Sequence, residues 1–308
     1  MELNATFYDL CMDAAGAIYA AMGTAQARGE PPPEPPQILQ LRAGLAESVG
    51  WFLVQAGEFD PEPLTVAALR VRDVYAAEPI VRALLEIMAS ERWFDRDEHG
   101  AYHLTALGRE LLLHRRAQRR ALVASLMPLH ADDLARLALL LERLIDASLA
   151  CPNPPGCWCL VHSRRRAPEH SAPPIVRIAQ YFDDLNAFRD DAHMAAWQPY
   201  GVAGYEWEAF ALVCAGTAHT AAQLFEQLAH RGYTRAEYGA ALERLAQRGW
   251  LAQRDSQYHP TTAGLAAHAE AEQRTNHYFF RPWGCLDAHA IDELERLLVR
   301  LRDSAPEH

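Results

Sequence analysis

Apolar positions recur at helical spacing along most of the chain, which predicts a mainly α-helical protein. Tyr238, Leu242 and Leu245, for example, are spaced so that they share one face of a helix. Polar tetrapeptides at 97–100 and 254–257, each between short apolar runs, predict β-hairpins. The predicted fold class is therefore mostly α with small β-hairpins.

The same order of elements occurs twice. The segment from Leu64 to Leu111 aligns with the segment from Thr220 to Ala267. The matched pairs are Trp93 with Trp250, Tyr102 with Tyr258, His103 with His259, Thr105 with Thr261, and Gly108 with Gly264. Each copy predicts helix, turn, helix, hairpin and helix, which is the pattern of a winged helix, so the sequence predicts two tandem winged-helix domains.

Helix start and stop signals give the expected boundaries. In the second copy, Thr220 and Thr234 are expected N-caps, and Gly232 and Gly249 are expected to end helices. Further expected elements are an extended Pro-rich linker at 31–36 and helices over about 37–56, 175–197 and 205–215. The predicted domains are an N-terminal winged-helix domain (1–150), a linker loop rich in Cys, Pro and Arg (151–174) and a C-terminal domain (175–308).

The second copy resembles the MarR-type winged-helix regulators over about Gly204 to Ser304. The resemblance lies in LERLAQRGWLAQRDSQYHPTTAG, the long helix after it and IDELERLLVRL. The stretch LNAFRDDAHMAAWQPYGVAGYEWEAF is similar to a set of actinobacterial two-winged-helix proteins. The first copy, in LLEIMASERWFDRDEHGAYHLTALGREL, also resembles the dimerisation domain of small-molecule O-methyltransferases, a winged helix with no DNA role. The chain contains no glycine-rich strand-turn-helix segment for S-adenosylmethionine, so methyl transfer is not supported.

The MarR resemblance implies a recognition helix over 234–248 and a wing over 250–258, with counterparts at 78–91 and 93–102 in the first copy. Such a helix enters the major groove of double-stranded DNA. The candidate DNA-binding residues are Arg235, Arg244, Arg248 and Arg254 in the second copy and Arg82 and Arg96 in the first.

Charge limits this expectation. The formal net charge is −11, so DNA binding requires a local basic surface. The first recognition helix sets Arg82 against Glu78, Glu86 and Glu91, which predicts a structural or partner-binding role for the first copy. A basic run also occurs on the helix expected after the first hairpin, at Arg109, Arg115, Arg116, Arg119 and Arg120. That run either contacts phosphates or, as we prefer, pairs with acidic residues elsewhere.

The linker carries a candidate metal site. Cys151, Cys157, Cys159 and His162 contain the ligand types of a tetrahedral zinc site, so zinc is a candidate cofactor, and a haem contact through Cys151 is a weaker one. The alternatives are a redox-sensing pair formed by Cys157 with Cys159 or Cys151, or an inert reduced connector.

A second candidate site lies on the helix expected at 175–197. Arg189, His193 and Trp197 are spaced to line one side of that helix and to contact a small-molecule effector. The alternative is a packed helix that joins the domains and whose charges pair locally.

The sequence contains no nucleophile elbow, P-loop or zinc-protease motif, so we expect no enzyme. It also has no apolar run long enough for a membrane span and no signal-peptide pattern, so we expect a cytoplasmic protein. The leading hypothesis is a transcriptional regulator, monomeric or homodimeric, whose two winged helices mimic a MarR-type dimer and respond to a ligand, metal or thiol state. The alternative is a ligand-sensing or protein-interaction module built on degenerate winged helices that do not bind DNA.

Overall fold

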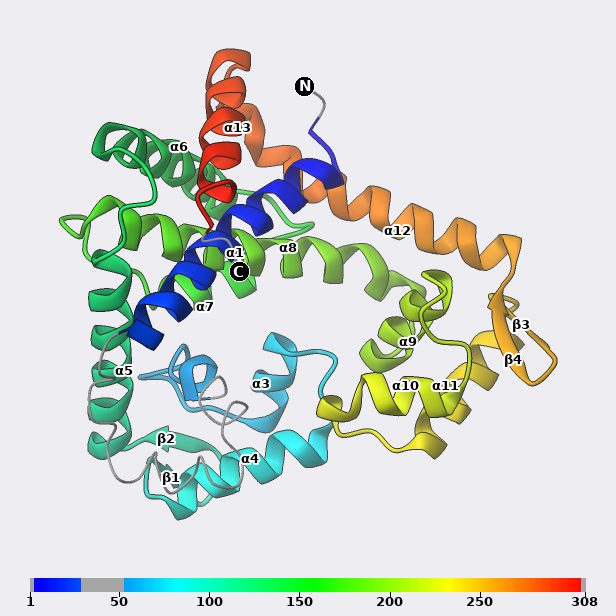
Figure 1. The fold of residues 1–308 in the computed structure, drawn as a ribbon. Coiled ribbons are helices and arrows are strands. Elements are labelled where there is room, and N and C mark those ends of the chain that lie inside the picture. The colour runs from blue at the N-terminus through cyan, green and yellow to red at the C-terminus, as the bar shows by residue number, and fades with distance from the viewer. Residues whose placement is uncertain (1–2, 29–52, 306–308) are drawn as a thin grey trace. The chain divides into compact units, whose positions relative to one another are not determined.

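The computed structural model describes residues 3–28 and 53–305 and confirms a mostly helical fold with two small antiparallel hairpins (Figure 1). The predicted linker at 31–36 and most of the helix predicted over 37–56 lie outside the described residues. Within the described ranges, no helix is both long enough and apolar enough to cross a membrane.

The elements of the first half are α1 (Ala5–Arg28), α3 (Val66–Arg72), α4 (Glu78–Ser90), β1 (Phe94–Arg96), β2 (Tyr102–Leu104), α5 (Ala106–Ala124), α6 (Ala131–Leu149) and α7 (Trp158–Arg164). Those of the second half are α8 (Pro174–Trp197), η1 (Gln198–Tyr200), α9 (Gly204–Cys214), α10 (Ala221–Gln227), η2 (Ala229–Arg231), α11 (Arg235–Gln247), β3 (Leu251–Arg254), β4 (Gln257–Pro260), α12 (Thr262–Phe280), η3 (Arg281–Cys285) and α13 (Ala288–Arg302). The helices predicted over 175–197, 205–215 and 234–248 correspond to α8, α9 and α11.

The chain forms two compact units, each assembled from distant parts of the sequence. Unit 1 comprises residues 1–47, 110–192 and 276–308, and unit 2 comprises residues 48–109 and 193–275. Unit 2 therefore contains the first aligned segment as far as Arg109 and the second as far as Thr275. The domain boundaries predicted at 150 and 174 stay a prediction.

Unit 1 has a leucine-rich helical core. In α6, Leu137, Leu141 and Leu144 repeat at spacings of four and three residues and are fully buried. Helix α1 packs against α13. Phe7 of α1 also meets Trp283 edge to face, with ring centroids 5.3 Å apart. These contacts bury the apolar faces that the helical periodicity predicts.

The second copy begins and ends its helices where the sequence predicts. The Thr220 side chain accepts the Gln223 N–H and caps α10, and Gly232 follows η2 at a φ of +81°. Thr234 and Glu237 form a reciprocal capping box at the start of α11. Gly249, at a φ of +80°, follows the end of α11 in the left-handed conformation that glycine adopts without strain.

Matching hydrogen bonds occur at equivalent positions of the two aligned segments. The Thr105 hydroxyl donates to the Arg92 carbonyl at 2.7 Å and accepts the Gly108 N–H at 3.0 Å, and the Thr105 N–H donates to the Trp93 carbonyl at 2.9 Å. Thr261 makes the same three contacts in the second copy, with Gly249 at 2.6 Å, Gly264 at 3.0 Å and Trp250 at 2.9 Å. The matched Trp, Thr and Gly positions therefore form one repeated joint between the hairpin and the helix that follows it.

The second hairpin has a tighter turn than predicted. Arg254 pairs with Gln257 in the strand ladder, so the polar turn is only Asp255 and Ser256 and not the predicted 254–257. Both turn residues have positive φ, at 49° and 62°, as a two-residue hairpin turn requires. The sequence did not reveal this because neither position is glycine.

The segment 151–174 is not the continuous loop that was predicted, because it contains α7. This helix lacks a side-chain cap of its own at Cys157. Instead, Asp191 of α8 accepts the N–H groups of Cys159 and Leu160 at 2.8 and 3.0 Å. The cap lies 32 residues away in sequence from Cys159, so local signals do not predict it.

Candidate nucleic-acid interface

Helix α11 of the second copy has one buried and one exposed face. Tyr238, Leu242 and Leu245 are buried, and the helix packs against α9 and α10. Arg235 and Glu243 are exposed. The exposed face is the part of this helix that could meet a macromolecular partner.

Arg235 and Arg254 are the predicted DNA-binding arginines whose charges are available. Arg235 is the first residue of α11, and Arg254 ends β3 at the hairpin tip. Both side chains are exposed, and neither forms a hydrogen bond or ion pair with any residue in the described part of the chain. The N-terminal residues of a recognition helix are the ones that contact base edges, so Arg235 occupies the favoured place.

Arg244 and Arg248 instead brace α11 within its own winged helix. The Arg244 guanidinium donates to the Glu206 carboxylate at 2.5 Å and to the Tyr205 hydroxyl at 2.6 Å. The hydrogen bond that Arg244 donates to Glu206 raises the pKa of the Arg244 guanidinium. Arg248 donates to the Tyr200 carbonyl and lies over the Trp250 ring, 4.7 Å from its centroid.

The two predicted arginines of the first copy are also engaged. Arg82 pairs with Glu78 one helical turn earlier, at 2.6 Å, and its hydrogen bond to that carboxylate raises the pKa of the guanidinium. Arg96 lies over the Tyr102 ring, 5.8 Å from its centroid. The structure thus separates the six predicted residues into two with available charges and four with partners.

Within unit 2, the start of α4 is covered by the second copy. The Ala77 N–H donates to the Arg231 carbonyl at 2.8 Å. A Cβ added at Gly232 would lie 2.8 Å from the Cβ of Ile80, which shows how closely the two segments approach. The end of α4 that corresponds to the base-contacting end of a recognition helix is therefore in contact with protein.

Arg231 joins the two copies, and no sequence pattern predicted this role. Its guanidinium binds Glu208 of α9 at 2.7 Å and Asp73, which follows α3, at 3.2 Å. It also lies over the Tyr75 ring, 5.2 Å from the centroid. Burial raises the pKa of Glu208, although the hydrogen bond from Arg231 opposes that effect.

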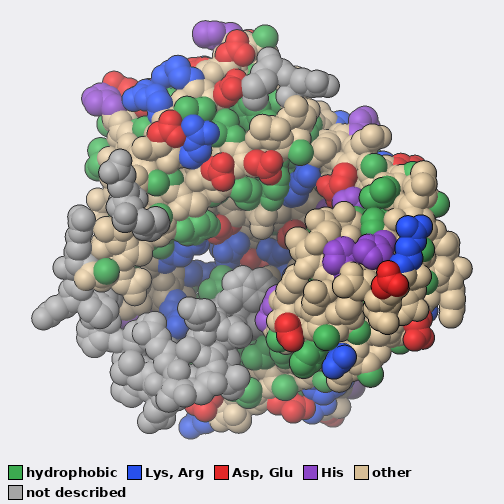
Figure 2. Space-filling view, turned by 45° about the vertical axis from the view of Figure 1, so that its right-hand side comes forward, with side chains coloured by type: hydrophobic (Ala, Val, Ile, Leu, Met, Phe, Trp, Pro, Cys, Tyr) green, Lys and Arg blue, Asp and Glu red, His purple; other side chains and the backbone are tan. Residues whose placement is uncertain are grey.

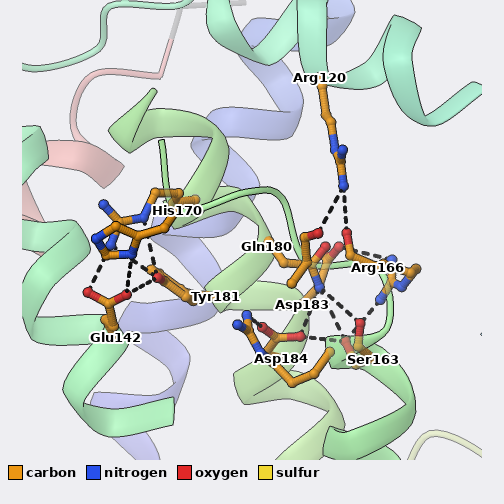
Figure 3. Close-up of polar contacts among 12 residues, drawn as sticks. Arg120, Glu142, Ser163, Arg166, His170, Gln180, Tyr181, Asp183 and Asp184 are labelled. Atoms are coloured by element: carbon orange, nitrogen blue, oxygen red, sulfur yellow. Dashed lines mark hydrogen bonds and ion pairs between the residues drawn. The ribbon is translucent and has the colours of Figure 1, made fainter. Parts of the chain in front are cut away.

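The basic run on α5 has protein partners in the described part of the chain. Arg109 binds Asp60 at 2.6 Å, and Arg119 binds Asp183 at 3.0 Å. Arg120 donates to the carbonyl oxygens of Arg166 and Ala167 at 2.8 and 3.2 Å (Figure 3). These contacts support the interpretation that the run pairs with groups elsewhere in the chain.

The three predicted effector-binding residues do not share one set of contacts. Arg189 donates to Asn276 at 2.7 Å, and its guanidinium lies 4.6 Å from the centroid of the Tyr8 ring, both in unit 1. His193 contacts Thr275 and Trp207, each at 3.3 Å, in unit 2. Trp197 is buried, and its ring stacks on Trp207 with centroids 5.8 Å apart. These contacts are those of packed helix residues, and the predicted effector site stays a prediction.

The structure does not gather the predicted zinc ligands into one cluster, so the zinc site stays a prediction without support from the described residues. Among the residues that the structure describes, no group of three or more His, Cys, Asp or Glu side chains is arranged to hold a metal ion. His162 points its Nδ1 atom at the Trp158 carbonyl, 2.8 Å away, and Cys159 is fully buried. Burial also raises the pKa of Cys151 and Cys157, which disfavours the thiolate that a metal requires. The redox pair stays a prediction.

Charges of both signs alternate on the visible surface. On the face shown in Figure 2, basic and acidic side chains are interspersed over the described residues. This face therefore carries no broad basic patch over the described residues.

Comparison with known proteins identifies the family. Residues 101–307 match the model of a helix-turn-helix family, a match that runs from the first hairpin through the whole second copy. No curated protein and no solved structure gives a significant match. Because the family match covers most of the chain, the protein belongs to this helix-turn-helix family.

Proposed function

We propose that this protein is a DNA-binding transcriptional regulator that contacts DNA through its second winged helix. Helix α11 would lie in the major groove, and the β3–β4 hairpin would contact the phosphate backbone as a wing. The proposal rests on two exposed arginines in the second copy. Arg235 lies at the capped start of α11, and Arg254 lies on the hairpin. Membership of the helix-turn-helix family supports it.

The four predicted arginines of the second copy would have two different roles. Arg235 would contact a base edge or a phosphate, and Arg254 a phosphate. Arg244 and Arg248 would act as positioning residues, because they already bind Glu206 and the Tyr200 carbonyl. Their loss would loosen α11 and not remove a DNA contact directly.

The first copy would act as a scaffold. A MarR-type pseudo-dimer within one chain requires two free recognition helices, and the covered start of α4 argues against that arrangement. A homodimer of the whole chain would instead supply two copies of α11 for a two-fold DNA site. Gating by a ligand or by a thiol state would then act on the spacing of the two copies of α11.

The test is binding to random-sequence duplex DNA, followed by fluorescence anisotropy across a salt series. We expect the affinity to fall steeply as salt rises, with a slope of about 0.9 per phosphate contact. The double variant Arg235→Ala/Arg254→Ala should bind more weakly and flatten that slope by about one to two. The matched control is Arg296→Ala, which removes an exposed arginine from α13 of unit 1 and should leave binding unchanged.

A second candidate function is protein interaction without DNA. It is favoured by the exposed Glu243 on α11 and by the net charge of −11, because both oppose a phosphate backbone. Absence of binding at low salt, or binding without salt dependence, would select this function over the first.

A further inference from the structure

Two histidines meet at the base of the second hairpin. His219 directly precedes Thr220, the N-cap of α10, and His259 lies on β4. Their ring centroids are 5.0 Å apart, and both residues are partly exposed.

The His219 ring is held in a defined orientation. Its backbone N–H donates to the Gln223 side chain at 2.7 Å, and its carbonyl accepts the Tyr258 N–H at 2.8 Å. The ring Nδ1 atom lies 3.1 Å from the Tyr258 carbonyl. A carbonyl can only accept a hydrogen bond, so Nδ1 carries the proton and the neutral ring keeps the lone pair on Nε2. A backbone carbonyl orients metal-ligating histidines in this same way.

The separation of the rings suits a shared ligand. Imidazole nitrogens bind divalent metals at about 2.0–2.1 Å, so two rings on one tetrahedral ion have centroids about 5 Å apart. The observed 5.0 Å matches that spacing.

The first copy shows that the fold does not need this pair. There the hairpin is bridged by Leu64, whose N–H and carbonyl both bond to Tyr102 at 2.8 Å. His103, the counterpart of His259, binds Asp97 at 2.9 Å instead. The backbone bridge is thus made without an imidazole in one copy, and the His219 ring is an addition of the second.

We propose that His219 and His259 form a two-imidazole site for a divalent transition-metal ion of the class that imidazole prefers, with water at the remaining positions. The bound ion would link β4 to the start of α10 and so hold the hairpin against the helix-turn-helix. This site is separate from the cysteine segment in unit 1, and it does not depend on the proposed DNA binding.

The test uses Ni²⁺ and the full chain, by calorimetric titration and by thermal unfolding with and without the ion. The variants are His259→Gln and His219→Leu, which places leucine where Leu64 makes the corresponding backbone bridge to the hairpin in the first copy. The matched control is His103→Gln, which changes the equivalent strand position of the first copy.

We expect each site variant to lose one equivalent of Ni²⁺ binding, or to weaken it at least tenfold, and to lose the metal-induced rise in unfolding temperature. The His103→Gln protein should keep both. Circular dichroism without metal checks that the variants fold. Unchanged Ni²⁺ binding in both variants, or loss in only one of them, would overturn the proposal, because a two-residue site needs both rings.

Discussion

Thr105 and Thr261 occupy equivalent places in the two copies, and each fixes its hairpin to the next helix with one hydroxyl. The glycines that follow them, Gly108 and Gly264, have no room for a side chain. A Cβ at Gly108 or Gly264 would lie 2.2 or 2.1 Å from the carbonyl oxygen of Trp93 or Trp250. The sequence match at these positions is therefore explained by backbone contact and not by flexibility.

Gly264→Ala should destabilise the protein, because the added methyl overlaps backbone that cannot move away. We expect a loss of about 1–3 kcal/mol in the free energy of unfolding, measured by denaturant titration. Gly16→Ala is the control, since that exposed position in α1 has nothing within 4 Å of an added Cβ. It should stabilise by about 0.5–1 kcal/mol through helix propensity, and a neutral Gly264→Ala would contradict the account.

Asp183 of α8 is a buried carboxylate held by cations. Arg119 and Arg166 lie 3.0 and 3.2 Å from its Oδ2 atom, and the Tyr19 hydroxyl donates to its Oδ1 atom at 2.5 Å. Burial alone would raise the pKa of Asp183, but the two arginines outweigh it and hold the pKa below its ordinary value of 3.8. The neighbouring Asp184, which binds Ser163 and Gln180 (Figure 3), shows the opposite result, because burial raises its pKa.

Asp183→Asn should therefore cost stability in a pH-dependent way. At neutral pH we expect a loss of about 3 kcal/mol, since two partly buried guanidinium groups lose their counter-charge. A carboxylate with a lowered folded pKa stabilises fully above 3.8 and loses that contribution as the pH falls through the folded value. The difference in free energy of unfolding between variant and wild type should thus shrink only below about pH 4, as measured by denaturant titrations at several pH values. A constant gap down to that range would contradict this account.

At the scale of elements, the sequence predicted helix ends that are set by neighbouring residues. The capping box of Thr234 and Glu237 starts α11, and the same helix ends just before Gly249, as the sequence predicted. The cap of α7 is different, because its acceptor is Asp191 on another helix. No pattern in the segment around α7 contains that information.

Asp191→Ala should selectively loosen α7. Two backbone N–H groups at the start of that helix would lose a charged acceptor, at a cost of about 1.5–3 kcal/mol. Hydrogen exchange should accelerate over residues 158–164 relative to α6, whose cap is its own His130. The control Asp292→Ala removes an exposed carboxylate from α13 and should change neither exchange nor stability. Unchanged exchange in α7 would show that Asp191 is not its cap.

At the scale of the whole molecule, the sequence predicted two copies but not which of their arginines contact other parts of the protein. The sequence predicts both Arg235 and Arg244 as DNA contacts, yet only Arg244 forms an ion pair, with Glu206 of α9. The contact between Ala77 and the Arg231 carbonyl likewise joins segments far apart in sequence. Such pairings depend on tertiary packing, so the candidate interface could be listed from the sequence but not narrowed to Arg235 and Arg254.

Arg231→Ala should weaken the joint between the copies. It leaves Glu208 and Asp73 partly buried without their shared cation, so we expect a loss of about 3 kcal/mol in the free energy of unfolding. Arg231→Lys should recover part of that loss, because it restores the charge but not the paired contacts with Glu208. Arg244→Ala, which removes a more exposed pair, should cost clearly less. An equal loss from Arg231→Ala and Arg244→Ala would contradict a special role for Arg231.

The central claim is that only the second copy contacts DNA. The most direct measurement compares two double variants, Arg235→Ala/Arg254→Ala and Arg82→Ala/Arg96→Ala, by anisotropy on the same duplex DNA across one salt series. Each removes two positive charges, one pair from each copy, so net charge is matched. We predict that the second-copy variant loses affinity and flattens the salt slope by about one to two, while the first-copy variant follows the wild type. An equal effect of both variants, or a larger effect of the first-copy variant, would contradict the account.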